Sequence, residues 1–400
     1  MGTSTPSPTQ TPMEPSAGDN PPSPDPLPPQ HGGNKKKLIL AIIAGVVLIG
    51  AGIGAFALMQ NKDQAAAKIK VGVLLPLSGG TSGTGYGGLK GIELAKKQLG
   101  ADNIEIVKAD SGCEAEQAAK AMQELIAKKV VAIIGDLCSG SSLAVLPQAN
   151  QHKIPMISPS ASSPDLSIAN DYFFRVVPPD EFQGKFTAET MIGKGIKTAS
   201  ILYTDGPYGQ ALSKVFKENF EKLDGQVVSS ESLALDEVNV QTHVDTIKAA
   251  NPEGVYLILD TAPTAVGVIK LLSAGGVTAS IYGADALYDE NIITEAGEAA
   301  EGFLVTSFDG GTKSFRQSLA ASSSDGQSYG AAGAYDALHA IFLATQKGAT
   351  TGEQIKQQLE KTNFKGVTTT IKFNDKGEIT ENYTYDLVVA KDGAFVPLAE

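Results

Sequence analysis

Two serine-rich segments carry the side chains in this chain that are best suited to chemistry. The first, GDLCSGSS (135–142), lies between a predicted strand and a predicted helix, and the second, SPSASSPDLS (158–167), follows the next predicted strand. Hydroxyls and a thiol at such a turn can form a nucleophile, a metal site, a redox centre or an anion-binding site. The surrounding sequence helps to separate these possibilities.

Catalytic and metal motifs are missing around these turns. Ser139 lies in G-x-x-C-S-G, which does not match the G-x-S-x-G motif of a serine hydrolase. The four histidines (His31, His152, His243 and His339) show no spacing that would pair a base with an orienting carboxylate. There is also no H-E-x-x-H motif, Cys/His cluster or EF-hand loop. The sequence therefore favours a protein that is not an enzyme and has no metal site.

A glycine motif near the first predicted strand resembles a cofactor fingerprint. Gly83, Gly85 and Gly88 fit G-x-G-x-x-G, but SGGTS (78–82) separates them from the strand. Dinucleotide sites need a tight turn at this point. We therefore expect a loose loop whose amides can approach a ligand, and no cofactor.

An anion site is the remaining interpretation of the serine-rich turns. The first amides of a helix lack intrahelical partners and carry partial positive charge, and Ser139, Ser141 and Ser142 add hydroxyl donors there. Neither turn contains Arg or Lys, which favours a carboxylate over a phosphate. Ordinary helix capping by serine is the alternative. Two such turns on successive strands favour a binding site.

The elements that would position these turns alternate along residues 68–400. Apolar runs predict strands at 70–77, 103–110, 130–135, 155–158, 197–204, 254–260 and 280–285. Helical spacing predicts helices between them, including 114–129 and 143–152. This pattern is typical of an α/β fold with parallel sheets covered by helices on both faces. A length of 333 residues exceeds one core, so two lobes are expected. NDKGE (374–378) predicts a hairpin turn.

The N-terminal region has a different composition. Residues 1–30 hold ten of the 21 prolines, which predicts a disordered Pro-rich tail over 1–37. Leu38–Met59 contains no polar side chain and is long enough for one transmembrane helix, with 60–67 as a linker. Lys35–Lys37 predict that the N-terminus is cytoplasmic. A cleaved signal peptide ending near Ala57 is the alternative, although the apolar run is long for one.

This topology places residues 60–400 outside the cytoplasm. The net charge of −12 falls on residues 68–400, which argues against nucleic-acid binding. In an extracytoplasmic compartment Cys113 and Cys138 can form a disulfide, while two buried free thiols are the alternative.

The order of motifs resembles the solute-binding proteins of branched-chain amino-acid ABC uptake systems, of the leucine/isoleucine/valine-binding type. The resemblance covers residues 68–400 and rests on KVGVLLPLSG, SGC with GDLCSGSS, IPMISPSASSPDL, YFFRVVPPDEFQG, SILYTDGPYGQ, AGEAAEGFLVT and YGAAGAYDALHAI. It implies a two-lobed type I periplasmic-binding fold and pairs Cys113 with Cys138.

The resemblance also assigns ligand-binding roles by position. The ligand carboxylate falls to Ser139, Ser160 and Ser162, the α-ammonium to Asp285, and an aromatic contact to Tyr208. Two further positions, usually aromatic, hold Thr84 and Thr261 here, although Tyr86 is near the first. Polar residues there, with Asp260 adjacent, argue against a branched aliphatic side chain.

The function implied is a membrane-anchored binding protein that delivers a small amino acid to an ABC permease and its ATPase subunits. We expect a monomer with lobe 1 at 68–179 and about 309–372, and lobe 2 at about 180–308 and 373–400. A sensory ectodomain of the same fold is the alternative. An enzyme on a related scaffold is disfavoured by the missing base and nucleophile.

Overall fold

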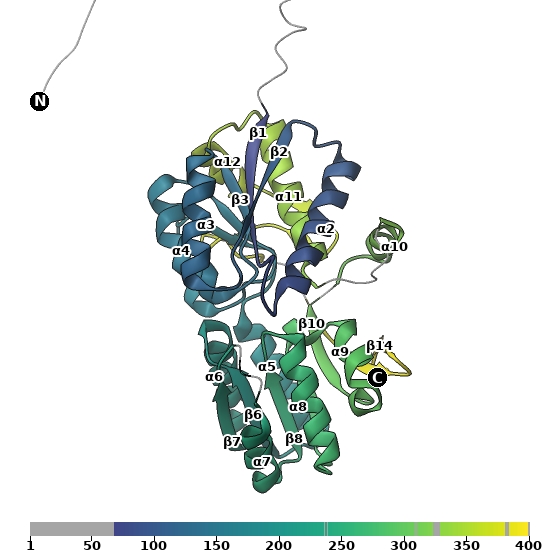
Figure 1. Ribbon diagram of the computed structural model, residues 1–400. Helices are drawn as coiled ribbons and strands as arrows, with labels where there is room; N and C mark the ends of the chain where they lie inside the picture. Colours follow the sequence, from purple (N-terminus) through teal and green to yellow (C-terminus); the bar gives the residue numbers. More distant parts are fainter. Residues whose placement is uncertain are drawn as a thin grey trace, which may run out of the picture. The chain divides into compact units, whose positions relative to one another are not determined.

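The computed structural model describes residues 68–235, 237, 239–308, 310–322, 329–380 and 384–398 (Figure 1). Its first sheet is wholly parallel, with the strand order β2-β1-β3-β4-β5. The strands are β1 (Ile69–Leu75), β2 (Ile104–Asp110), β3 (Ala132–Gly135), β4 (Met156–Ser158) and β5 (Phe173–Arg175). Apolar runs such as AIIG are buried throughout, as expected for strands covered on both faces.

Helices from both ends of the described chain cover this sheet. From the first half they are α2 (Ser82–Leu99), α3 (Ala115–Ala127) and α4 (Ser139–His152), with η1 (Pro164–Leu166) before β5. From the second half they are α11 (Ala331–Gln346), which packs against α2, and α12 (Gly352–Leu359), which packs against α11; α10 (Lys313–Ser322) also contacts α2 (Figure 1). The chain therefore returns to the first sheet after it has formed the parallel strands of the second sheet, and it adds the last two strands of the second sheet afterwards.

The second sheet has seven strands in the order β14-β13-β10-β9-β8-β6-β7. These are β6 (Thr198–Thr204), β7 (Gln226–Leu233), β8 (Gly254–Ile258), β9 (Ser280–Gly283), β10 (Leu304–Phe308), β13 (Tyr385–Lys391) and β14 (Ala394–Pro397). The strands from β6 to β10 pair in parallel, whereas β13 and β14 are antiparallel. The sequence pattern did not predict the β7, β10, β13 and β14 strands.

The second sheet has its own helices. They are α5 (Asp180–Gly193), α6 (Pro207–Lys222), α7 (Gln241–Ala250), α8 (Ala262–Ala274) and α9 (Glu290–Ala296), with the short turns η2 (Asp285–Leu287) and η3 (Gly297–Ala300). Separate apolar clusters lie on each side of this sheet, one around Leu257 and Val305 and one around Phe216 and Tyr256. Two β–α layers with separate cores confirm the two-lobed α/β fold.

The C-terminal boundary between the two layers differs from the expected position at residue 373. Phe373 and Ile379 belong to the core of the first sheet and pair across the NDKGE turn as an antiparallel bridge. That segment, together with the small sheet of β11 (Phe364–Lys365) and β12 (Thr370–Ile371), therefore stays with the first layer. The expected hairpin turn is present, although its flanks pair only briefly.

A disulfide joins Cys113, after β2, to Cys138 at the start of α4. This confirms the expected pairing, and the alternative of free thiols is wrong. The Pro-rich tail, Leu38–Met59 and the 60–67 linker lie outside the described residues. Among the helices that the structure describes, none combines the length and apolar character needed to cross a bilayer.

Candidate functional site

The first serine-rich turn is organised by a buried carboxylate. Gly135 has φ 126°, and a side chain there would place a Cβ 1.8 Å from the Leu74 carbonyl oxygen, so the strand can end this way only at glycine. Asp136 follows, fully buried, and accepts hydrogen bonds from the Leu137 amide and from the Ser141 hydroxyl at 2.7 Å. Burial raises the pKa of Asp136 to about 6 against the effect of these hydrogen bonds. Ser141 therefore stabilises the turn and is not available as a ligand donor.

The second serine-rich turn is tied to the first. Ser158 donates to the Asp136 carbonyl at 2.6 Å and accepts from the amides of Ser160 and Ala161. Ser139 accepts from the Ser163 amide at 3.2 Å, which leaves the Ser139 hydroxyl proton for another acceptor. The two turns thus meet at the carboxyl ends of β3 and β4, where open parallel sheets bind ligands.

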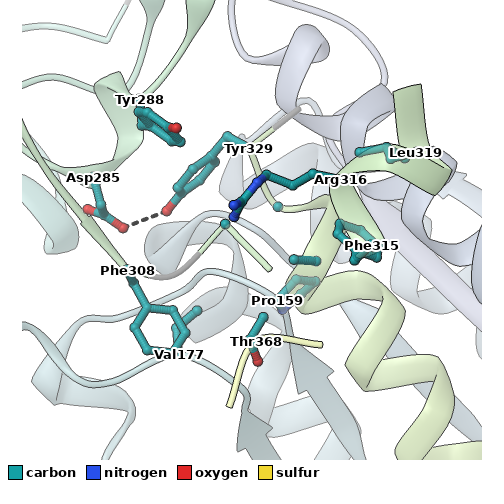
Figure 2. Close-up of a pocket in the computed structure, with 14 residues that line it drawn as sticks. Pro159, Val177, Asp285, Tyr288, Phe308, Phe315, Arg316, Leu319, Tyr329 and Thr368 are labelled. Carbon is teal, nitrogen blue, oxygen red and sulfur yellow. Dashed lines mark hydrogen bonds between the residues drawn. The ribbon is translucent and has the colours of Figure 1, made fainter. Parts of the chain in front are cut away.

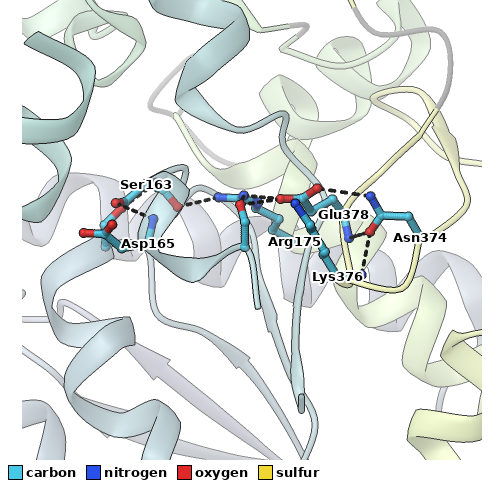
Figure 3. A network of polar contacts seen from close by, with 8 residues as sticks. Ser163, Asp165, Arg175, Asn374, Lys376 and Glu378 are labelled. Carbon is cyan, nitrogen blue, oxygen red and sulfur yellow. Dashed lines mark hydrogen bonds and ion pairs between the residues drawn. The ribbon is translucent and has the colours of Figure 1, made fainter. Parts of the chain in front are cut away.

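A buried ion pair holds the second turn from behind (Figure 3). Arg175, with no exposed surface, donates to the Ser163 carbonyl at 2.9 Å and pairs with Glu378 at 2.5 Å. Glu378 also accepts from Ser167 at 2.6 Å and from Asn374 at 3.1 Å. Burial pushes the pKa of Glu378 upward, but these hydrogen bonds and the guanidinium outweigh burial and hold it below its usual value. This network fixes the turn, and Arg175 Nε is the guanidinium nitrogen that it leaves without a hydrogen-bond partner in the described part of the chain.

Asp285, in η2 at the end of β9, faces the serine-rich turns from the other layer. Its carboxylate accepts from the Tyr208 hydroxyl at 2.9 Å and from the Tyr329 hydroxyl at 2.6 Å (Figure 2). The Tyr329 hydroxyl also lies 2.8 Å from the Ser160 hydroxyl. A single phenol therefore bridges the carboxylate of one layer and the serine turn of the other.

Burial keeps these phenols protonated. It is the main reason that the pKa values of Tyr208 and Tyr329 lie well above the usual range, and the charge of Asp285 adds to the shift. Burial, with a contribution from Asp285, likewise raises the pKa of Asp180 well above its ordinary value and that of Asp260 to about 6. Three acids, Asp180, Asp260 and Asp285, therefore lie close enough on this side of the site to influence one another, and of the three Asp180 also feels the charge of Arg175.

Two small cavities lie on either side of Tyr329. The first, of ≈ 40 Å³, is lined by four predicted ligand residues together with Asp260 and Tyr329; the four are Thr84, Ser139, Ser160 and Tyr208. The second, of ≈ 50 Å³, is lined by Asp285, Arg316 and mostly apolar side chains (Figure 2). Within the described ranges no group of three acids, histidines or cysteines is placed to hold a metal ion.

Three other candidates lie elsewhere. The Thr261 hydroxyl caps α8 and bonds to Thr264, and its methyl group packs against the Gly80 turn. Ser162 is buried, and its carbonyl accepts the Asp180 amide. Tyr86, which was considered beside Thr84, is 52% exposed. None of these three side chains lines either of the two cavities.

Tyr329 is the central residue that sequence reasoning did not select. It lies more than forty positions from Asp285 along the chain, and only the return of the chain toward α11 brings it between the two serine turns and Asp285. The one available signal was its place at the start of YGAAGAYDALHAI, one of the motifs that carried the family resemblance.

Comparison with known proteins identifies the family. Residues 68–394 match the family described as periplasmic binding protein. The chain belongs to this family. It is 27% identical over 261 residues to a Leu/Ile/Val-binding protein of Citrobacter freundii, covering 63% of this chain and 71% of that protein. Its relatives are solute-binding proteins of the branched-chain amino-acid type.

Solved structures support the same fold. A branched-chain amino acid transporter substrate-binding protein of Streptococcus pneumoniae, in complex with isoleucine, is 26% identical, with a TM-score of 0.74 and coverage of 83% of this chain and 100% of that chain. A solute-binding protein of R. palustris in complex with benzoate is 23% identical, with a TM-score of 0.75 and coverage of 83% and 95%, and shows the fold alone. Proteins of this architecture therefore hold chemically different ligands.

Proposed function

We propose that this chain is an extracytoplasmic substrate-binding protein of an ABC importer and that it closes two lobes on an amino acid. The family and its amino-acid-binding relatives support the class of function. The observation that carries the amino-acid assignment is the pairing of hydroxyls on one layer with a buried carboxylate on the other, Ser139 and Ser160 opposite Asp285. Such an arrangement complements a zwitterion.

The binding mode follows from the donors that remain free. The ligand carboxylate accepts from the Ser139 hydroxyl and from the first amides of α4, where the helix dipole favours negative charge. The ligand ammonium donates to Asp285 and takes over the contact that the Tyr329 hydroxyl makes. Because Tyr329 joins the two layers through Ser160 and Asp285, it stabilises a closed form without ligand, and the ligand replaces a neutral bridge with a charged one.

We further propose that lobe 1 comprises residues 68–179 and about 309–380, and that lobe 2 comprises about 180–308 and the C-terminal strands. In this scheme Leu38–Met59 anchors the chain in the membrane and the lobes lie outside the cytoplasm. Tethering would raise the effective concentration of the closed form at a permease and its ATPase subunits. The closed form, a monomer, would be the species that docks.

Thermal unfolding of the full chain with each common amino acid and with common sugars tests this function. An amino acid present at a hundred times its Kd should stabilise the protein by about 2.7 kcal/mol. Stabilisation by a sugar, with no response to any amino acid, would contradict the proposal.

A further inference from the structure

The second cavity contains the Arg316 guanidinium and the Asp285 carboxylate within a mostly apolar lining (Figure 2). Arg316, in α10, donates one N–H to the Gly311 carbonyl, and none of the ion pairs among the described residues includes it. An arginine has five N–H donors in a planar fork, so several stay available to an acceptor in the cavity. The apolar lining comes from both layers: Pro159, Val177, Phe308, Phe315 and Leu319.

The two cavities share Tyr329 in their lining and differ in the groups that they present. Ser139 and Ser160 lie in the first, Tyr329 lines both, and Asp285 and Arg316 lie in the second. Asp285 already accepts from two phenols and forms no ion pair with Arg316 in the part of the chain that the structure describes. Together the two cavities present serine hydroxyls, the carboxylates of Asp260 and Asp285, and the Arg316 guanidinium.

We propose that the ligand is an acidic amino acid and that Arg316 binds its side-chain carboxylate. This inference rests on the proposed function, because the α-carboxylate is assigned to the serine turns and the ammonium to Asp285. A ligand with two carboxylates flanking one ammonium complements all three positions. Its methylene groups lie against the apolar lining, and its terminal carboxylate accepts from the guanidinium fork.

The size of the second cavity agrees with this class. At ≈ 50 Å³ it has room for roughly three to five water-sized groups, since one such group needs about 10–15 Å³. A glutamate side chain has five non-hydrogen atoms beyond Cα. A leucine side chain also fits by volume but offers no acceptor to the guanidinium N–H donors that remain beyond the one bonded to the Gly311 carbonyl.

Isothermal titration of the full chain with L-glutamate, L-glutamine and L-leucine tests the assignment. Glutamate should bind at least about tenfold more tightly than glutamine, which has the same shape without the charge. Arg316→Gln should weaken glutamate binding by at least about tenfold and change glutamine binding by less than about threefold. Arg316→Lys should retain part of the glutamate affinity, because the charge remains without the planar fork.

Lys313→Gln is the matched control, because Lys313 is an exposed base on the same helix and lines neither cavity. It should bind glutamate like the parent. Equal losses in Lys313→Gln and Arg316→Gln would overturn the inference by showing a long-range charge effect. Leucine binding with no glutamate binding, or glutamate binding unchanged in Arg316→Gln, would overturn it while the proposed function stands. Benzoate binding that needs Arg316 but not Asp285 would replace the ligand class, and no response to any amino acid would refute the proposed function itself.

Discussion

Two buried carboxylates lie on opposite sides of the serine-rich turns and differ in their partners. Glu378 has a guanidinium at 2.5 Å and two further donors, so its charge is neutralised within the fold. Asp285 has only two phenols, and no base pairs with it among the residues that the structure describes. A buried carboxylate without a cation is costly. The comparison indicates that Glu378 serves stability, and it supports our proposal that a ligand cation completes the site at Asp285.

Removing Arg175, the cation that pairs with Glu378, should have the largest effect on the free energy of unfolding. Arg175→Met leaves Glu378 buried without its charged partner and removes the support of the Ser163 carbonyl. We expect a loss of about 3–5 kcal/mol in the free energy of unfolding, measured by urea denaturation. Lys120→Met, which breaks an exposed pair with Glu116, is the control and should hardly move the midpoint. A midpoint for Arg175→Met equal to that of the parent would show that the network does not stabilise the fold.

In contrast to Arg175→Met, Asp285→Asn should affect amino-acid binding more than stability. No cation is left unpaired by this change, so the stability without ligand should fall far less than in Arg175→Met. Amino-acid binding should weaken by more than about tenfold, because a hydrogen bond to a charged group contributes about 1.5–3 kcal/mol. Titration calorimetry and urea denaturation of the same preparation separate the two effects. Binding equal to the parent would remove Asp285 from the site.

Asp260, another buried carboxylate near the site, should make the stability of the fold depend on pH. Burial raises the pKa of Asp260 from 3.8 to about 6. An acid whose pKa is higher in the folded state binds more protons there, so its contribution to stability is present at low pH and is lost as the pH rises from about 4 through about 6. Asp260→Asn should remove about 2 kcal/mol of this loss, as measured by unfolding free energies at pH 4 and pH 7. Parallel pH profiles of variant and parent would show that the carboxyl is well solvated.

The sequence predicted the strands and the serine turns better than the contacts that complete the two carboxylate sites. Alternating apolar runs and helical spacing located β1 to β4 and the serine turns, because each depends on neighbouring residues. The roles of Arg175 and Tyr329 depend on segments far apart in the chain, where Glu378 and Asp285 arrive only through the fold. Thr261 was misplaced for a local reason. A threonine just before a helix can contact a ligand or cap the helix, and here its hydroxyl caps α8.

The smallest effect on ligand affinity is expected at the first serine-rich turn. Variants there should separate serines that bind the ligand from serines that hold the turn in place. Ser139→Ala removes the acceptor of the Ser163 amide and one donor to the ligand carboxylate. A hydrogen bond to a charged group contributes about 1.5–3 kcal/mol, but the first amides of α4 still donate to the carboxylate in this variant, so the amino-acid Kd should rise by at most about tenfold, less than in Asp285→Asn. Ser141→Ala is the matched control, because its hydroxyl serves Asp136 inside the turn. Ser141→Ala should lower the free energy of unfolding. The Kd of the folded variant for the amino acid should stay near that of the parent. If the two variants exchanged these profiles, Ser141 and not Ser139 would be the serine that binds the ligand carboxylate.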